Sequence, residues 1–365
     1  MACAIAWPTI RAYLQAIAVL SQVAGQPAPW VSRALTGAVT IEDLNLRLDG
    51  PGGARPVRAR LYLPVGRPNA PAMVIFHGVH YLGIDEPRLV GFARAMASCG
   101  IRVLTPELPG IKDYHVSEDS VETIGESVNW FAAKTGGPVG VMGLSFSGGL
   151  ALVAVEQPQY RKAFRFVFAV GAQDSMARVT QYYLTGRDAR PDGSVEVLKP
   201  HEYGPLVIEY EYLEDCVPAA DLEPVRAVLR AHLYENKQAE AQAMARLSPS
   251  QRAEAEALMD PSLPQTRAKI AHAIELNSYK FPELSPERGL ATIATPVYLL
   301  HGEADNVIPA AETLWMEKEL PHRWLKAALV SPVLSHIDLD GTKPGLMDQW
   351  RLLHFFATVM RAAER

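Results

Sequence analysis

The chain has 365 residues, of which 48% are hydrophobic and 21% are charged, and its formal net charge at pH 7 is −5. A chain with this many apolar residues is not mainly disordered. Its length is typical of two domains or of one large domain with an insertion. The chain has no basic excess to neutralise a phosphate backbone, so we expect no nucleic-acid partner.

The spacing of the cysteines and the absence of known cofactor motifs argue against a metal or cofactor site. Cys3, Cys99 and Cys216 lie far apart and form no CxxC pair. This spacing disfavours a disulfide framework or a structural zinc site, so we expect them to be small buried side chains. The sequence contains no HExxH, G-x-G-x-x-G or P-loop pattern, so no metal, dinucleotide or nucleotide site is expected.

The N-terminal segment, residues 1–30, is apolar but interrupted. Pro8 and Arg11 break the stretch from Ala2 to Val23, and the chain has no run of 18 or more apolar residues. The segment fits an amphipathic helix packed on the body, a weak membrane anchor or a processed export signal, and we favour the first. Localisation therefore stays open, with a weak membrane association through this segment as one expectation.

The elements after this segment begin with a hairpin. Period-two alternation predicts strands over 39–48 and 57–63, joined by a turn at 49–53. Beyond Pro71, short apolar runs alternate with helical stretches. Strands are predicted at 72–76, 101–105, 138–143 and 164–171, and helices at 88–98, 121–131 and 148–157. This alternation predicts a parallel sheet with helices on both faces.

The alternation stops near residue 172 and resumes near residue 296. The intervening segment is rich in Ala, Glu and Leu, and helices are predicted at 222–232 and 238–258. Strands at 297–300 and 325–330 and helices at 311–320 and 347–361 follow. Because a structureless loop of this length is implausible in a compact domain, we expect a helical cap over 172–289, inserted between core segments 31–171 and 290–365.

The strongest local motif is Gly143-Leu144-Ser145-Phe146-Ser147-Gly148, which follows an apolar strand and opens a helix. This is the context of a nucleophile elbow, where small flanking residues let the strand and the helix approach each other closely. Ser147 occupies the position where the common G-x-S-x-G pattern has its second glycine. A Gly/Ser-rich turn without chemistry is the alternative interpretation.

A serine nucleophile needs a base, and the base needs an acid to orient it. Asp305 and His336 follow the last two predicted strands, so both are expected at carboxyl ends of strands, as is Ser145. Ligand sites in open α/β sheets gather at that edge. The chain order Ser, Asp, His predicts a catalytic triad of these three residues, with Asp174 as an alternative acid.

In these motifs the chain resembles the α/β-hydrolase superfamily. The resemblance covers roughly residues 72–171 and 296–361, with the elbow, the acid loop and the late histidine in the family's order. It implies an eight-stranded, mostly parallel sheet with a cap inserted after the sixth strand, where the long insertion falls here. The serine at the elbow disfavours dehalogenase and epoxide-hydrolase chemistry, which use a carboxylate nucleophile.

The resemblance extends to His77-Gly78-Val79-His80, which is similar to the family's H-G-x-x oxyanion loop. It implies that the backbone N–H of Val79, or of its neighbour, and the backbone N–H of Phe146 hold the oxyanion. His77 is expected to shape the loop through its side chain. His80 either lines the pocket or faces solvent.

The expected function is that of a serine hydrolase of the carboxylesterase kind, acting on a small or medium ester. A peptidase or acyltransferase of the same superfamily, or a non-catalytic binding protein on this fold, are the alternatives. Tyr182 and Tyr183 in the insertion, together with His80, are candidate substrate-binding residues. The alternative for these tyrosines is that they pack the cap helices together.

Overall fold

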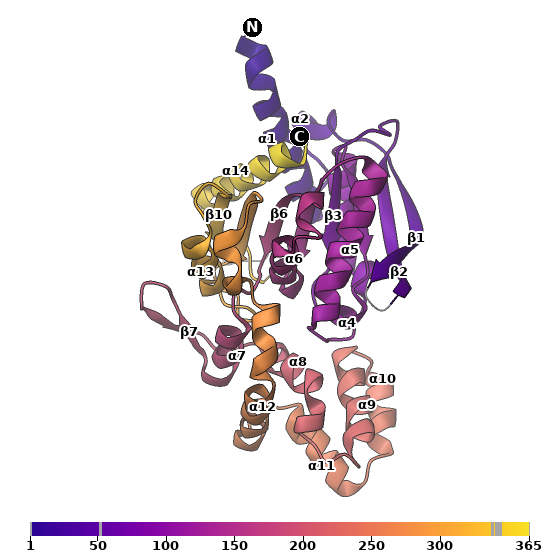
Figure 1. Cartoon of the computed structure of the whole chain (residues 1–365), viewed down its shortest axis with the longest axis vertical. Helices are drawn as coiled ribbons and strands as arrows, with labels where there is room; N and C mark the ends of the chain where they lie inside the picture. Colours follow the sequence, from indigo (N-terminus) through magenta and orange to yellow (C-terminus); the bar gives the residue numbers. More distant parts are fainter. Residues whose placement is uncertain (1, 51–52, 337–338, 340–344, 365) are drawn as a thin grey trace.

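The computed structural model describes residues 2–50, 53–336, 339 and 345–364. A central sheet lies between two layers of helices, and a mainly helical segment extends beyond one end of the sheet (Figure 1). The sheet has eight strands in the order β1-β2-β4-β3-β5-β6-β9-β10.

The sheet is mostly parallel, as predicted. The strands are β1 Val39–Gly50, β2 Gly53–Pro64, β3 Ala72–Phe76, β4 Arg102–Pro106, β5 Val139–Leu144, β6 Phe164–Val170, β9 Val297–Gly302 and β10 Leu325–Ser331. β2 pairs antiparallel with β1 and with β4, and the other neighbours pair in parallel. Part of the predicted hairpin turn, residues 51–52, lies outside the described residues.

Alternate side chains of the strands fill two separate cores. Along β6, Val167 and Ala169 face one cluster, whereas Phe166, Phe168 and Val170 face the other. Because both faces are covered, residues 166–170 of this strand form a continuous apolar run instead of an alternating pattern.

The first core is covered by α5 Glu118–Thr135, α6 Phe146–Glu156 and α13 Ala311–Glu319, and the second by α1 Ala2–Val23, α3 Pro87–Ser98 and α14 Leu346–Ala363. Two short helices, α2 Trp30–Arg33 and α4 Pro109–Lys112, connect other elements.

The N-terminal helix α1 packs against α14 and α3. Across the part of the chain that the structure describes, no helix has both the length and the hydropathy needed to cross a bilayer.

The segment between β6 and β9, residues 171–296, is called the insertion here. It holds α7 Met176–Thr185, β7 Arg187–Ala189, β8 Val195–Val197, α8 Tyr203–Glu211, α9 Leu222–Leu233, α10 Lys237–Ala245, α11 Pro249–Leu258 and α12 Pro264–Asn277. It lies beyond the carboxyl ends of the parallel strands (Figure 1). Short 3₁₀ turns complete the chain: η1 Gly83–Asp85, η2 Arg161–Ala163, η3 Leu213–Asp215, η4 Ser278–Leu284, η5 Pro286–Arg288 and η6 Leu290–Thr292.

The prediction of one continuous helix over 238–258 is wrong. The chain ends α10 at Ala245 and starts α11 at Pro249. The Ser248 hydroxyl accepts a hydrogen bond from the N–H of Gln251 and caps the new helix, and a proline is well tolerated at the first helical position. The β7–β8 hairpin was also not predicted, since each of its strands has only three residues.

Candidate active site

Ser145 lies at the turn from β5 into α6, in a strained backbone conformation. Its φ is 55° and its ψ is −136°, a region that residues with a Cβ rarely adopt. Its N–H donates to the carbonyl oxygen of Val170 at 2.8 Å, which ties the turn to the neighbouring strand. A Cβ added at Gly143 would lie 2.4 Å from the carbonyl oxygen of Ser147, so only glycine fits there. The turn therefore has the geometry of a nucleophile elbow.

The structure brings the three predicted residues together above the carboxyl ends of β5, β9 and β10. His336 Nε2 lies 3.0 Å from Ser145 Oγ, and His336 Nδ1 lies 2.5 Å from Asp305 Oδ2. If Nδ1–H donates to Asp305, Nε2 carries a lone pair and accepts the proton of the serine hydroxyl. This arrangement can move a proton from Ser145 to His336 while Asp305 stabilises the positive charge.

Asp305 is fully buried and is held by several donors. Its Oδ1 accepts hydrogen bonds from the N–H groups of Val307 at 2.9 Å and Ile308 at 3.0 Å, and His301 Nε2 lies 3.2 Å from Oδ2. Burial alone raises the pKa of this carboxyl, but the charge of His336 and the hydrogen bonds from both histidines outweigh it and lower the pKa to about 2. Asp305 is therefore an anion at neutral pH.

The loop that carries His336 packs directly on the end of β9. A Cβ added at Gly302 would lie 1.5 Å from the carbonyl oxygen of Ser335. Only glycine therefore permits this approach, which brings His336 to Asp305 on the following loop.

The predicted oxyanion loop lies beside the elbow. A Cβ added at Gly78 would be 3.3 Å from Ser145 Cβ, and the Ser147 hydroxyl donates to the carbonyl oxygen of His77 at 2.5 Å. The His77 ring is buried, accepts the N–H of Leu108 at 2.9 Å and has its pKa lowered to about 4 by burial. The neutral imidazole thus holds the shape of the loop, and the hydroxyl of Ser147 fixes this loop to the elbow.

The next feature of this region is a pair of backbone N–H groups, that of Val79 in the loop and that of Phe146 at the elbow. In the described part of the chain, neither the N–H of Val79 nor that of Phe146 donates a hydrogen bond to another protein group. Phe146 is also the first residue of α6, where N–H groups have no acceptor within the helix. The carbonyl oxygen of Val79, by contrast, accepts a 2.8 Å hydrogen bond from the hydroxyl of Tyr203 on α8. No local sequence pattern predicts this contact between the insertion and the loop.

The hydrogen bonds described for the predicted substrate-binding residues do not join them to Ser145. The Tyr182 hydroxyl donates to the carbonyl oxygen of Asn306, next to Asp305, at 3.2 Å, and Tyr183 is buried. Among the described contacts, neither hydroxyl hydrogen-bonds to Ser145. The ring of His80 is about half buried, and its Nδ1 accepts the N–H of a residue in the same loop.

Asp174, the alternative acid, belongs to a different cluster. It is buried, forms an ion pair with Arg178, and its N–H donates to Glu312 at 2.9 Å. Burial and the Glu312 carboxylate raise its pKa to about 8. No contact joins it to His336 in the described residues, which likewise contain no group of three or more His, Cys, Asp or Glu side chains suited to a metal ion.

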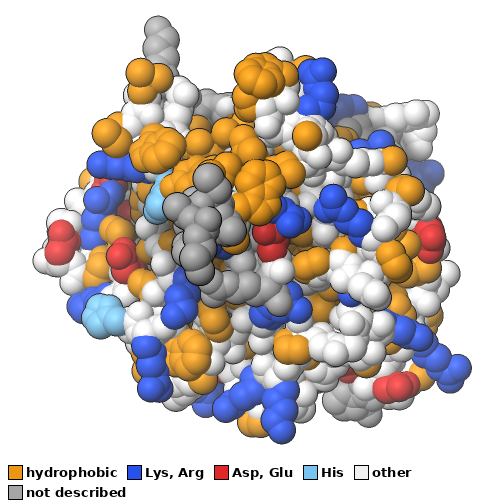
Figure 2. All heavy atoms as spheres, turned by 90° about the horizontal axis from the view of Figure 1, so that it is seen from above, with side chains coloured by type: hydrophobic (Ala, Val, Ile, Leu, Met, Phe, Trp, Pro, Cys, Tyr) orange, Lys and Arg blue, Asp and Glu red, His pale blue; other side chains and the backbone are white. Residues whose placement is uncertain are grey.

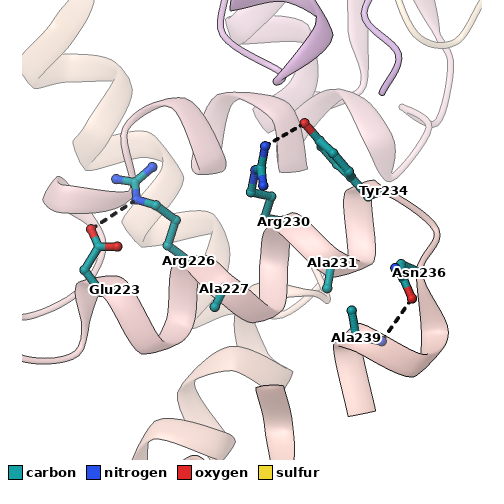
Figure 3. Close-up of a pocket in the computed structure, with 8 residues that line it drawn as sticks. All are labelled: Glu223, Arg226, Ala227, Arg230, Ala231, Tyr234, Asn236 and Ala239. Atoms are coloured by element: carbon teal, nitrogen blue, oxygen red, sulfur yellow. Dashed lines mark hydrogen bonds and ion pairs between the residues drawn. The ribbon is translucent and has the colours of Figure 1, made fainter. Parts of the chain in front are cut away.

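An open depression of about 400 Å³ lies on the insertion, between α9 and α10, and Ser145 is not among the residues that line it (Figure 3). Arg230 faces Tyr234 there, and its guanidinium is already bound to Asp113 at 2.8 Å. At the candidate site itself, Ser145 is 4% exposed and the His336 side chain is 20% exposed.

Comparisons with known proteins support the fold. No family model matches the sequence, and no curated protein matches it significantly. A Bacteroides ovatus protein provisionally named dipeptidyl aminopeptidase IV is 13% identical, with a TM-score of 0.51 over 89% of this chain and 36% of the other. A Pyrobaculum calidifontis esterase is 20% identical, with a TM-score of 0.48 over 91% and 87%. An acylaminoacyl peptidase is 13% identical, with a TM-score of 0.46 over 81% and 38%.

This chain spans little more than a third of the length of the two peptidase structures. Its strand order and its likeness to the Bacteroides ovatus structure show that it has the α/β-hydrolase fold. Because this fold carries many unrelated activities, the function has to be argued from the site.

Proposed function

We propose that this protein is a serine hydrolase that cleaves a carboxylic ester through an acyl-enzyme on Ser145. The observation that carries the proposal is the hydrogen-bonded chain from Ser145 through His336 to the buried Asp305, with distances of 3.0 and 2.5 Å. A binding protein has no need of a strained serine joined to a base and to a buried anion.

In the first half-reaction, Ser145 Oγ attacks the carbonyl carbon of the ester while its proton passes to His336 Nε2. The tetrahedral intermediate collapses, the bond from the carbonyl carbon to the alkoxy oxygen breaks, and His336 gives its proton to the departing alcohol. Water, deprotonated by His336, then attacks the acyl carbon, the bond from that carbon to Ser145 Oγ breaks, and His336 returns the proton to Oγ as the acid leaves. Asp305 stays ionised throughout and stabilises the imidazolium.

The N–H groups of Val79 and Phe146 are the proposed oxyanion donors. Neither is used by another protein group in the described residues, and the Gly78 position brings the loop close to Ser145. A donor of this kind contributes about 3 kcal/mol to the stabilisation of the transition state.

The insertion serves as the cap in this proposal. It meets the oxyanion loop through Tyr203, and Tyr234 at the end of α9 stacks on Tyr81 with ring centroids 5.5 Å apart. In this proposal the insertion borders the path of the ester to Ser145, which is 4% exposed. We expect the cap to limit the size of the acyl group.

The test is labelling with a fluorophosphonate, with Ser145→Ala as the diagnostic variant. Ser127→Ala is the matched control, since Ser127 is a buried serine on α5 with no hydrogen-bond partner among the described residues. The wild type and the control should gain the mass of one phosphonyl group, and Ser145→Ala should gain none. We also expect its kcat on p-nitrophenyl acetate to fall about 10³-fold or more. Labelling or wild-type turnover in Ser145→Ala would rule out the proposal.

Peptide-bond hydrolysis by the same three residues is the second candidate, because the Bacteroides ovatus structure carries a peptidase name. The two candidates separate on matched substrates, p-nitrophenyl esters of increasing acyl length and aminoacyl p-nitroanilides. A kcat/KM that is higher for the anilides than for the esters would favour the peptidase, despite the poorer leaving group.

A further inference from the structure

An exposed apolar surface lies where α1 meets α14, at the end of the molecule opposite the insertion (Figure 1). Figure 2 looks down on this end and shows hydrophobic side chains gathered near its centre. Trp7 and Ile10 on α1 and Leu346, Met347 and Trp350 on α14 are about half exposed or more, from 49% at Ile10 to 86% at Leu346. We call these five residues the α1–α14 patch.

The patch is anchored on the body of the protein. Tyr13 of α1 stacks on Trp350 with ring centroids 5.5 Å apart, and its hydroxyl hydrogen-bonds to His354. Ala12 and Ala16 are fully buried, so they pack α1 on the second core. The exposed side chains therefore belong to a fixed helix pair, not to a loose tail, and their exposure is a property of the folded surface.

The charge around the patch is positive, although the whole chain has a net charge of −5. Arg11, Arg33, Arg351 and Arg361 lie on α1, α2 and α14, and the acidic residues described on these helices and at the end of α14 are Asp348 and Glu364. Arg11 pairs with Glu364 at 2.9 Å and Arg351 lies 3.7 Å from Asp348, so the net positive charge rests on Arg33 and Arg361. Figure 2 shows Lys and Arg side chains around the apolar centre, with Asp and Glu side chains among them. Acidic residues outnumber basic ones in the insertion, so the opposite end of the molecule is negative.

We propose that the α1–α14 patch docks this protein on an anionic lipid bilayer, with the insertion turned to the water. Tryptophan is enriched at membrane–water interfaces, and Trp30 of the adjacent α2 adds a third exposed indole, at 82%. An apolar helix face with basic neighbours fits a surface that is apolar below and anionic above.

A second copy of the chain fits this surface less well. A symmetric dimer would pair the same patch with itself and bring two surfaces of net positive charge together, whereas lipid phosphates neutralise that charge. Because no described helix is long and apolar enough to span a bilayer, the docking is peripheral. This proposal is independent of the proposed hydrolase activity.

The test is sedimentation of the full chain with vesicles of phosphatidylcholine alone and with about one third phosphatidylglycerol. We expect binding to the anionic vesicles that weakens at high salt, with a blue shift of tryptophan emission. Trp7→Ser with Trp350→Ser should lower the partition coefficient about tenfold or more. The control Tyr279→Ser removes an aromatic ring that is 73% exposed on the insertion and should bind like the wild type.

Because Trp350 also stacks on Tyr13, a second pair, Leu346→Ser with Met347→Ser, checks that lost binding is not lost folding. Its thermal midpoint should match that of the wild type while its vesicle binding falls. Wild-type chain that stays in the supernatant with both vesicles would overturn the proposal, as would unchanged binding by both pairs. A dimer in sedimentation velocity that both pairs dissociate, without vesicle binding, would assign the patch to a second copy instead.

Discussion

The contact between Tyr203 and Val79 makes the oxyanion loop dependent on the insertion. The Tyr203 hydroxyl donates to the Val79 carbonyl oxygen at 2.8 Å, and burial raises the pKa of this phenol well above its usual value, so it remains a donor. That carbonyl shares a rigid peptide plane with the N–H of His80, next to the N–H of Val79. The hydrogen bond therefore holds the Val79–His80 peptide plane and, through the backbone of Val79, restrains the adjacent Gly78–Val79 plane, which carries the proposed donor.

Tyr203→Phe removes this hydrogen bond and keeps the ring, whose edge contact with Tyr114 has centroids 5.7 Å apart. A neutral hydrogen bond contributes about 0.5–1.5 kcal/mol net. If the whole of this is lost in the transition state and none in the bound substrate, kcat falls about two- to twelvefold and KM is unchanged.

The assay is steady-state hydrolysis of a p-nitrophenyl ester, with Tyr234→Phe as the matched control. The Tyr234 hydroxyl donates to Asp113 at 2.6 Å, so its loss also breaks a bond between the insertion and the core, but leaves Val79 untouched. We expect kcat to fall in Tyr203→Phe and to change less in Tyr234→Phe. An equal fall in both variants, or a rise in KM at constant kcat, would refute the reasoning, because it would mean that Tyr203 only holds the insertion in place.

Asp305→Asn keeps the shape of the site but removes the anion that orients His336, so kcat should fall by about 10³–10⁴, and near-normal turnover would contradict this role. Ser147→Ala removes the donor to the buried carbonyl oxygen of His77 and should lower the free energy of unfolding, measured with urea, by about 1–3 kcal/mol. An unchanged urea midpoint would contradict this role of Ser147. Glu209 is buried without a partner among the described residues, and burial raises its pKa to about 9 from an ordinary 4.5. Between these values the folded state keeps a proton that the unfolded state has lost, so stability falls as pH rises. Glu209→Gln should therefore raise Tm in calorimetry more at pH 8 than at pH 5, and an equal gain at both would refute this.

The core elements could be predicted because each carries its own local signal. The strands β3 and β6 are short apolar runs bounded by polar turns, and a parallel sheet covered on both faces requires such runs. The break before Pro249 was missed because the apolar spacing continues across it. Its signal is the serine and proline of a helix start, which outweighs periodicity there.

The three residues of the proposed triad could be found for the same reason, since Ser145, Asp305 and His336 each follow a strand of a parallel sheet, and topology brings those ends together. Tyr203 has no such local signal, because its partner lies 124 residues away and depends on how the insertion packs. Ser147 is an intermediate case. A serine at an elbow position where glycine suffices is buried by the geometry of the turn, and a buried hydroxyl needs an acceptor. The departure from G-x-S-x-G thus already implied a polar partner, but only the fold shows that the partner is the backbone of the oxyanion loop.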